Sequence, residues 1–478
     1  MAPPNPEPQT DRSGYLAVDT IAALATPLGG AIAIIRLSGP QTHVALARLG
    51  ATRALEHPRE LLRVALRGVD GAVVDDAMVA SFPGPASFTG EDCAELHLHG
   101  SSIIATRLLE DLAKLGVRQA LAGEFSFRAV RNGKMTLSQA EAVADLIASS
   151  NETAAALALD KLSGLQNRQL GGLAEALRQL ATLGEIGIDF ADQDVEEVGL
   201  PRLKERAQGI CTQLITVGES FARGTRIQDG ISVAFVGRPN AGKSSFFNAL
   251  LGEDRSIVSE IAGTTRDVVR ERLVLRGKRG SVTLRLEDTA GLRITSDAVE
   301  KIGIERSRQA ASRADIVLWI VDSAAMVVDT DERQALLREW AALGAPADRT
   351  VGILTKLDLL DLSQVRELRA AVAELGIPVW AEVSSTLGEG MSAAAALIAD
   401  FAERWVHRQP GELVLTRIDH LESVNATVLH LKRAVGAPEI DLFASDIRQA
   451  LLALAPLIGD TVADDILGRV FSQFCIGK

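Results

Sequence analysis

The stretch Gly237-Arg-Pro-Asn-Ala-Gly-Lys-Ser244 decides the fold of this chain, because it fits the pattern Gly-x4-Gly-Lys-Ser/Thr. An apolar run at 231–236 precedes it and predicts a buried strand, and a helical pattern follows it. Glycines let the backbone bend so that its N–H groups converge on phosphate oxygens at a helix N-terminus. Lys243 would add a point charge to the outer phosphates, and Ser244 would offer its hydroxyl to Mg²⁺. The sequence therefore predicts a phosphate-binding loop.

Two later motifs match the loops that surround the γ-phosphate in a GTPase. The segment Gly263-Thr-Thr-Arg-Asp267 offers Thr265 to Mg²⁺ in a loop that can become ordered around the γ-phosphate. The segment Asp288-Thr-Ala-Gly291 follows an expected strand, which would place Asp288 near the metal and Gly291 beside the γ-phosphate. These spacings indicate a nucleotide switch.

Base recognition is assigned to two further segments. Thr355-Lys-Leu-Asp358 follows an expected strand, and Asp358 can accept two hydrogen bonds from guanine, which adenine cannot donate. Thr355 stands where this motif usually has asparagine. Ser384 and Ser385 follow the last expected strand and would close over the base. The nucleotide is therefore expected to be GTP. The residues of the phosphate-binding loop that are expected to contact GTP are Asn240, Ala241, Gly242, Lys243, Ser244 and Ser245.

The residue that would orient the attacking water does not follow from a standard motif. Ras-like proteins place a water-orienting glutamine after the Asp-x-x-Gly motif, where this chain has Leu292. Glu300 is the nearest carboxylate that could act through water. A solvated acid on a helix face is the alternative interpretation of Glu300.

The order of apolar patterns indicates three parts. Runs at 31–35, 73–82 and 93–98 with turns between them predict a compact α+β domain, and the period from Leu137 to about Arg223 is helical. Strands expected at 231–236, 282–286, 316–321, 351–354 and 379–383 alternate with helices, as in a parallel α/β sheet. The last residues are helical again but too few for their own core, so the α/β part is expected to be inserted into a discontinuous helical domain. We expect a disordered tail over 1–13, an N-terminal domain over 14–131, helical segments over 132–229 and 405–478, and the inserted domain over 230–404.

Composition agrees with this plan. The 478 residues correspond to about three domains at roughly 150 residues each. Three scattered cysteines are too few for a disulfide framework, so a reducing cytoplasm is expected, and no apolar stretch is long enough to span a bilayer. The formal charge of −12 argues against a protein coated with positive charge for nucleic acid.

One row of potential ligands is not expected to bind a metal. Cys93, Glu95, His97 and His99 share one face of an expected strand. Because they spread over about 20 Å, they cannot converge on a single ion. The acidic run from Asp189 to Glu197 is expected to be a solvated helix end, and a hinge that transmits switch motion is the alternative interpretation.

Several stretches resemble the MnmE/TrmE family of tRNA modification GTPases, and the resemblance covers nearly the whole chain after the proline-rich tail. The matching stretches are Asp19-Thr-Ile-Ala-Ala-Leu-Ala-Thr-Pro27, Ser87-Phe-Thr-Gly-Glu-Asp92, Gly123-Glu-Phe125, Gln139-Ala-Glu-Ala-Val-Ala-Asp-Leu-Ile147, Val299-Glu-Lys-Ile-Gly-Ile-Glu305 and Phe474-Cys-Ile-Gly-Lys478. The last of these is the most specific.

The resemblance implies a fold and a folate site for the N-terminal domain. That domain would be similar to tetrahydrofolate-binding domains and would dimerise. Arg36, Glu95 and Lys134 would contact a 5-formyl or methylene tetrahydrofolate, the two cations at its carboxylates and Glu95 at its pterin edge. Cys475 would reach the same site as an acid or thiolate, or else pack as an ordinary tail residue.

The resemblance also implies a monovalent cation in the GTPase site. The family uses K⁺ where other GTPases use an arginine finger, and the K⁺ lets two GTPase domains meet face to face. Asn240, Ser259, Thr264 and the backbone of Ile261 match its ligands. Glu300 aligns with the glutamate that positions water.

The family's reaction implies a partner and an RNA substrate. Its members act with MnmG, an FAD-dependent protein, to install an aminomethyl or carboxymethylaminomethyl group at C5 of the wobble uridine of certain tRNAs. Two alternatives stay open: a ribosome-assembly GTPase of the Era/Der type, and a folate-dependent transferase whose GTPase is vestigial. The folate-type N-terminus argues against the first, and the intact phosphate motifs argue against the second.

Overall fold

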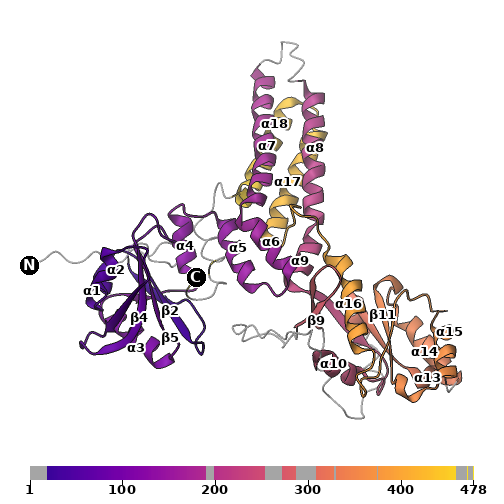
Figure 1. Cartoon of the computed structure of the whole chain (residues 1–478). Coiled ribbons are helices and arrows are strands. Elements are labelled where there is room, and N and C mark those ends of the chain that lie inside the picture. The colour runs from indigo at the N-terminus through magenta and orange to yellow at the C-terminus, as the bar shows by residue number, and fades with distance from the viewer. Residues whose placement is uncertain are drawn as a thin grey trace, which may run out of the picture. The chain divides into compact units, whose positions relative to one another are not determined.

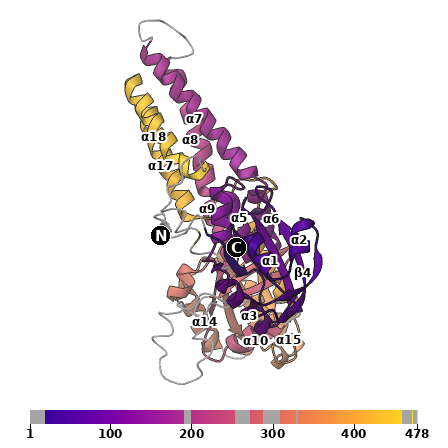
Figure 2. The same cartoon turned by 90° about the vertical axis from the view of Figure 1, so that its left-hand side faces the viewer.

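The computed structural model describes residues 19–189, 199–252, 272–286, 308–327, 330–373, 375–458, 471 and 477. The chain divides into two compact units. Figures 1 and 2 show the helices and strands of the chain in two views turned by 90°. The first unit draws on residues 1–144, 161–175 and 451–478, and the second on residues 145–160 and 176–450. Each unit therefore combines segments that are far apart in the sequence.

A six-stranded sheet forms the centre of the first unit. Its strand order is β3-β4-β5-β2-β1-β6, and its neighbours are antiparallel except for the parallel pair of β1 and β6. The strands are β1 (Ile21–Leu24), β2 (Ile32–Ser38), β3 (Leu62–Arg67), β4 (Val73–Phe82), β5 (Cys93–His99) and β6 (Arg118–Gln119). The expected strands at 31–35, 73–82 and 93–98 thus correspond to β2, β4 and β5.

Helices cover both faces of this sheet. The helices of this part are α1 (Thr42–Arg48), α2 (Thr52–Glu56), α3 (Ser102–Lys114) and α4 (Glu124–Arg131). Residues of α1, α2 and α3 share one apolar core with alternate residues of β2, β4 and β5. Phe125 of α4 packs with Ile21 and Ala23 from the opposite face of β1. The period-two alternation of the strands therefore gives two buried faces.

A second six-stranded sheet belongs to the second unit. Its order is β12-β11-β10-β7-β9-β8, and all neighbouring pairs are parallel except β8 with β9. The strands are β7 (Ile231–Val236), β8 (Arg272–Arg276), β9 (Ser281–Leu286), β10 (Ile316–Asp322), β11 (Thr350–Thr355) and β12 (Trp380–Glu382). The expected α/β domain is confirmed, and its five expected strands are β7, β9, β10, β11 and β12.

The helices of this sheet lie on its two faces. They are α10 (Lys243–Gly252), α13 (Ser323–Val327), α14 (Thr330–Leu343), α15 (Leu362–Ala373) and α16 (Met391–Val406), with short 3-10 turns η2 (Ala347–Arg349) and η3 (Leu357–Leu359). Residues of α10 and α16 pack against one face, and residues of α13, α14 and α15 pack against the other. Successive residues of β10 alternate between the two cores, as a strand buried on both faces requires.

The remaining helices come from the chain segments before and after the inserted sheet in the sequence. They are α5 (Leu137–Ala148), α6 (Glu152–Leu162), α7 (Leu165–Asp189), α8 (Leu200–Glu219), α9 (Phe221–Asp229), α17 (Ile418–Gly436) and α18 (Ile440–Ile458). Figure 1 shows α7, α8, α17 and α18 running side by side. Gly184 of α7 lies close to Ala444 of α18, and Gly218 of α8 lies close to Val424 of α17. The discontinuous helical domain is therefore confirmed. Where each domain begins and ends stays a prediction.

Among the described residues, no helix is both long and apolar enough to cross a membrane.

Candidate nucleotide-binding site

The phosphate-binding loop lies at the carboxyl end of β7, where ligands bind in open α/β sheets. Asn240 adopts a left-handed backbone conformation with φ of 62°, and Gly242 has φ of 91°. A Cβ atom on Gly237 would lie 2.3 Å from the carbonyl oxygen of Ile320 on β10. The glycines therefore let the loop turn tightly against the sheet.

Lys243 is folded back over this loop. Its Nζ donates hydrogen bonds of 2.7 Å to the carbonyl oxygens of both Gly237 and Arg238. Burial lowers the pKa of Lys243 from its usual value, because the charged form loses hydration. Ser244 and Ser245 follow in the first turn of α10. The ammonium group is thus positioned at the loop where phosphate charge would offset its desolvation.

The other side of the loop is held from α14. The Nε and Nη2 atoms of Arg238 each donate a 2.8 Å hydrogen bond to the carboxylate of Glu339. This two-point ion pair fixes the direction of Arg238 away from the bend. Sequence reasoning missed Glu339, since nothing in its helical context marks it as a partner of the loop.

Thr355 connects the phosphate loop to the base-recognition segment. Its buried hydroxyl lies 2.6 Å from the carbonyl oxygen of Ala241 and 3.1 Å from that of Val321. Gly242 also faces this side chain, because a Cβ atom on it would lie 3.3 Å from the Thr355 hydroxyl. The residue that departs from the usual asparagine therefore contacts the phosphate loop directly.

The base-recognition segments meet at the ends of β11 and β12. The backbone N–H of Leu357 donates to the carbonyl oxygen of Val383 at 3.3 Å, which brings the two segments together. Lys356 has φ of 57°, and its Nζ lies 2.6 Å from a carboxylate oxygen of Asp322 at the end of β10. Asp322 was missed at the sequence level, although its position after a buried strand is a usable signal.

The predicted base contacts differ in exposure. Asp358 is exposed in η3, so its carboxylate is free to reach a ligand. Ser384 is buried, and its hydroxyl accepts a hydrogen bond from the backbone N–H of Leu387 at 3.3 Å. Within the described part of the chain, the buried hydroxyl of Ser385 has no hydrogen-bond partner. Ser385 therefore offers an unused donor and acceptor beside the base-recognition segment.

Several predicted site residues lie outside the described residues, and their roles stay predictions. They are Ser259, Ile261, Thr264, Thr265, Asp288, Gly291, Glu300 and Cys475.

The three predicted folate residues all lie in the first unit. Arg36 and Glu95 are directly opposite each other on β2 and β5, and Arg36 Nη2 lies 2.8 Å from the Glu95 carboxylate. Both are about one-quarter exposed, and the ring of Phe88 lies 5.2 Å from the Arg36 guanidinium carbon. Lys134 donates a 2.9 Å hydrogen bond to the carbonyl oxygen of Pro85. The segment from Pro85 to Phe88 thus contacts Arg36 and Lys134, and Glu95 is joined to it through Arg36.

The row of potential metal ligands is used for ion pairs instead. Glu95 contacts Arg36 on one side and His97 Nε2 at 3.3 Å on the other. Cys93 is buried against Thr89, whose hydroxyl lies 3.1 Å from its Sγ, and His99 pairs with Asp75. The four side chains of this row therefore contact different partners in the described part of the chain.

The end of the chain reaches the same unit. A Cβ atom on Gly477 would lie 2.2 Å from the carbonyl oxygen of Leu24, the last residue of β1. Phe471 packs edge-on against Phe127 of α4, with ring centroids 5.8 Å apart. Ala23, next to Leu24, is paired with Arg36 across the strands. Gly477 therefore lies beside β1, the strand that pairs with β2 and its Arg36.

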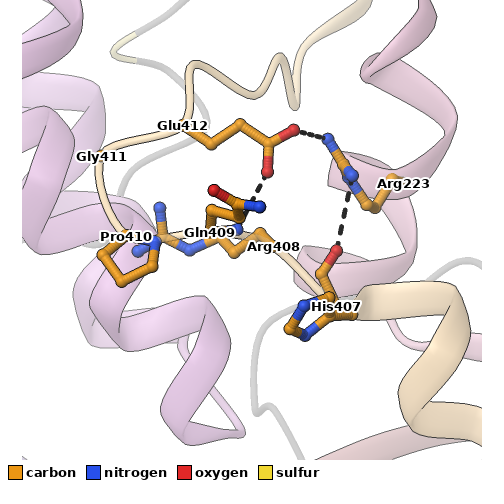
Figure 3. A pocket seen from close by; sticks show the side chains of 7 residues that line it. All are labelled: Arg223, His407, Arg408, Gln409, Pro410, Gly411 and Glu412. Atoms are coloured by element: carbon orange, nitrogen blue, oxygen red, sulfur yellow. Dashed lines mark hydrogen bonds and ion pairs between the residues drawn. The ribbon is translucent and has the colours of Figure 1, made fainter.

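A separate cavity of about 490 Å³ lies where α9 faces the segment after α16 (Figure 3). Part of its polar lining is engaged: Arg223 donates to the carbonyl oxygen of His407 at 3.4 Å and to the carboxylate of Glu412. Glu412 also accepts from the backbone N–H of Gln409 at 3.0 Å. These contacts join α9 to the segment after α16. The cavity is therefore a weaker candidate for a ligand site than the phosphate-binding loop.

Known families match nearly the whole chain. A family model described as the MnmE helical domain matches residues 137–475, and one described as the N-terminus of the GTP-binding protein TrmE matches residues 20–134. A curated protein of Azoarcus sp. strain BH72, named tRNA modification GTPase MnmE, is 40% identical over 462 residues, covering 96% of this chain and 98% of that protein. A protein of the same name from Laribacter hongkongensis is 41% identical, and the match covers 97% of this chain and 100% of that protein. Another from Psychrobacter sp. strain PRwf-1 is 38% identical, and the match covers 96% of this chain and 99% of that protein.

Proposed function

The chain belongs to the MnmE family of tRNA modification GTPases, and from this premise we propose that its GTP hydrolysis depends on K⁺ and serves the modification of wobble uridine. The modification would place an aminomethyl or carboxymethylaminomethyl group at C5 of the uridine in certain tRNAs. A one-carbon unit from a tetrahydrofolate and an FAD-dependent partner of the MnmG type would take part. Family membership favours this role over ribosome assembly, because the matching relatives are named for tRNA modification.

The observation that carries the proposal is the meeting of the motifs at one edge of the parallel sheet. The phosphate loop follows β7, and the base-recognition segments follow β11 and β12. Thr355 joins the two halves through its hydroxyl bond to Ala241. Such an edge can hold the phosphates at one end and the guanine at the other.

The roles of the described residues follow from their positions. Lys243 would exchange its two carbonyl contacts for phosphate oxygens, and the backbone N–H groups of the loop would bind the same phosphates. Ser244, in the first turn of α10, fits Mg²⁺ because a hydroxyl oxygen is a ligand that this ion accepts, and we assign Thr265 as its second protein ligand. When bound, Mg²⁺ neutralises charge on the phosphates.

Asn240 fits the K⁺ role by its exposure and backbone. It is exposed at the outer bend of the loop, where its backbone is left-handed, so its side chain is open to a ligand. Ser259, Thr264 and the carbonyl of Ile261 would complete the ligand set. A K⁺ ion in this place supplies the positive charge that an arginine finger supplies elsewhere. Glu300 would orient the attacking water through a second water molecule.

The folate proposal rests on the exposed ion pair of the first unit. Arg36 and Glu95 satisfy each other without ligand, and both remain partly open to solvent. A folate could therefore receive its carboxylates at Arg36 and Lys134 and its pterin edge at Glu95. We also propose that the N-terminal domain mediates a homodimer, and that the domain limits are 14–131, 132–229 with 405–478, and 230–404.

Hydrolysis rates in KCl and NaCl test the proposal. We expect the full chain to hydrolyse GTP at least about tenfold faster in KCl than in NaCl at equal ionic strength, because K⁺ replaces the arginine finger. The variant Asn240→Ala should lose most of this difference while still binding GTP. Ser163→Ala serves as a control, since Ser163 lies between α6 and α7 and not among the predicted K⁺ ligands. Equal wild-type rates in the two salts would contradict the K⁺ assignment.

A further inference from the structure

The hairpin of β8 and β9 joins the two loops that carry the nucleotide-sensing motifs. β8 begins at Arg272, five residues after the Gly-Thr-Thr-Arg-Asp motif, and β9 ends at Leu286, two residues before Asp288. β9 is parallel to β7, whose carboxyl end carries the phosphate loop. Each of these two loops is therefore continuous in sequence with one strand of the hairpin.

The middle of the hairpin is held by the segment that precedes α6. The buried hydroxyl of Thr283 lies 2.8 Å from the hydroxyl of Ser150 and accepts a 2.9 Å hydrogen bond from Asn151 Nδ2. The backbone N–H of Glu152 donates to the hydroxyl of Ser281 at 3.3 Å. These contacts join β9 to residues about 130 positions earlier in the chain.

Asn151 connects three elements at once. Its Oδ1 accepts a 2.8 Å hydrogen bond from the backbone N–H of Ala154, as an N-cap of α6 does. Its Nδ2 donates both to Thr283 on β9 and, at 3.3 Å, to the carbonyl oxygen of Ile227 on α9. A displacement of β9 would therefore disturb the first turn of α6 through one side chain.

The turn of the hairpin is held by α16. The backbone N–H of Lys278 donates to Asp400 at 2.9 Å, and the backbone N–H of Arg279 donates to Glu403 at 2.8 Å. Both carboxylates belong to α16, which leads out of the inserted sheet. With its turn held there, the hairpin has less freedom to absorb a shift by bending.

Apolar packing makes the connection stiff. Ala154 and Leu157 of α6 belong to the same buried core as Leu273, Val282 and Leu284 of the hairpin. A Cβ atom on Gly230, at the entrance to β7, would lie 3.1 Å from the Cγ2 atom of Thr283. Packed interiors transmit displacement because they contain little free volume.

We infer that Asn151 is a positioning residue that couples the nucleotide state to the start of α6 through Thr283 and the β8–β9 hairpin. A loop arrangement that differs between GTP and GDP shifts β9, and this shift strengthens or weakens the Asn151–Thr283 hydrogen bond. The local opening of the first turn of α6 therefore depends on which nucleotide is bound. This inference rests on the GTPase activity of the family and is independent of the K⁺ and folate assignments.

Hydrogen exchange of the full chain tests the inference. Peptides covering residues 150–158 are compared with GDP bound and with GDP plus aluminium fluoride bound, in KCl. Thr283→Val removes the hydroxyl at nearly constant volume. Asn151→Asp keeps a side-chain oxygen for the α6 cap but removes both donors to β9 and α9. Thr283→Ser keeps the hydroxyl and is the conservative rescue. Thr350→Val is the matched control, since it removes another buried hydroxyl from the same sheet, one that bonds to the carbonyl oxygen of Pro346 at 2.9 Å.

The expected result separates coupling from stability. The hydrogen-exchange rate of residues 150–158 should differ between the two nucleotide states in three proteins: the wild type, the Thr283→Ser variant and the Thr350→Val variant. In Thr283→Val and Asn151→Asp this difference should shrink by about fivefold or more, the lower end of typical coupling factors, while GDP still binds. A wild type without any difference would overturn the inference, as would an undiminished difference in Thr283→Val. A loss of equal size in Thr350→Val would assign the effect to general destabilisation and overturn it too. The rates in KCl and NaCl test the proposed function separately.

Discussion

Replacing Thr355 by valine tests how the phosphate loop is held in the shape that binds GTP. Valine keeps the volume of the side chain but cannot donate a hydrogen bond. The carbonyl oxygen of Ala241 would lose its 2.6 Å contact, and that of Val321 would lose its 3.1 Å contact. Because Thr355 is 1% exposed, water has no ready access to replace the hydroxyl.

The size of the effect follows from these contacts. A buried polar group left without its partner costs about 1–3 kcal/mol, so the free energy of unfolding should fall by about 2 kcal/mol. If about 1.4 kcal/mol of this loss comes from the bound arrangement of the loop, GTP should bind about tenfold more weakly. Thr355→Ser keeps the hydroxyl, and its affinity should stay within about twofold of the wild type.

The assay compares affinity with stability. Kd for a GTP analogue that is not hydrolysed is measured by calorimetry, and the free energy of unfolding is measured by urea titration. Thr350→Val is the control, because Thr350 lies at the other end of β11 and donates to Pro346 rather than to the loop. It should lose stability without losing affinity. If Thr355→Val bound the analogue as tightly as Thr350→Val, the assigned role of Thr355 would be wrong.

Three further predictions concern hydrolysis, backbone geometry and pH. Glu300→Ala should lower kcat by about a hundredfold or more with Kd for GTP unchanged, and normal turnover would refute the role of Glu300 in orienting water. Gly237→Ala should prevent GTP binding while a circular dichroism spectrum stays native, because its Cβ would meet the carbonyl oxygen of Ile320 at 2.3 Å; wild-type affinity would contradict the tight bend. Burial alone would raise the pKa of Asp315, but hydrogen bonds from Ser232 and Arg226 outweigh it and lower the pKa below the usual 3.8. The stability from this carboxylate is therefore present well above pH 3.8 and is lost as the pH falls through the lowered pKa. The free energies of urea unfolding of the wild type and Asp315→Asn should differ by about 2 kcal/mol at pH 6 and by less at pH 3.5. A difference that stays constant with pH would refute this.

The parallel sheet was predictable because its central strands β7, β10 and β11 are buried on both faces. Ile231–Val236 and Ile316–Asp322 are continuous apolar runs followed by polar or glycine residues, which is a strong local signal. β8 was not predicted. It is an antiparallel edge strand with an arginine at each end, so its three apolar residues resemble many short loop segments.

Contacts between distant segments could not be predicted from the sequence. Arg36 and Glu95 were each assigned to a folate, but their mutual ion pair depends on the register of β2 with β5. The bond between Asn151 and Thr283 joins residues separated by 132 positions, and neither residue belongs to a motif. Motifs locate the chemistry of a site, whereas the residues that hold it in place are found only in the fold.

The position of Asp322 shows an intermediate case. It ends a buried strand at the ligand-binding edge, so its location was predictable, but its 2.6 Å contact with Lys356 required the neighbouring strand. The charge of −12 argued only against a chain coated with positive charge and did not indicate the reaction.

The most direct test of the central claim is mass analysis of wobble nucleosides in tRNA from cells that lack this protein. We expect the C5-modified uridines to disappear, to return when the wild-type chain is supplied, and to stay absent with Lys243→Ala, whose phosphate contact is lost. Unchanged nucleosides in the deletion strain would contradict the claim that this GTPase acts in tRNA modification.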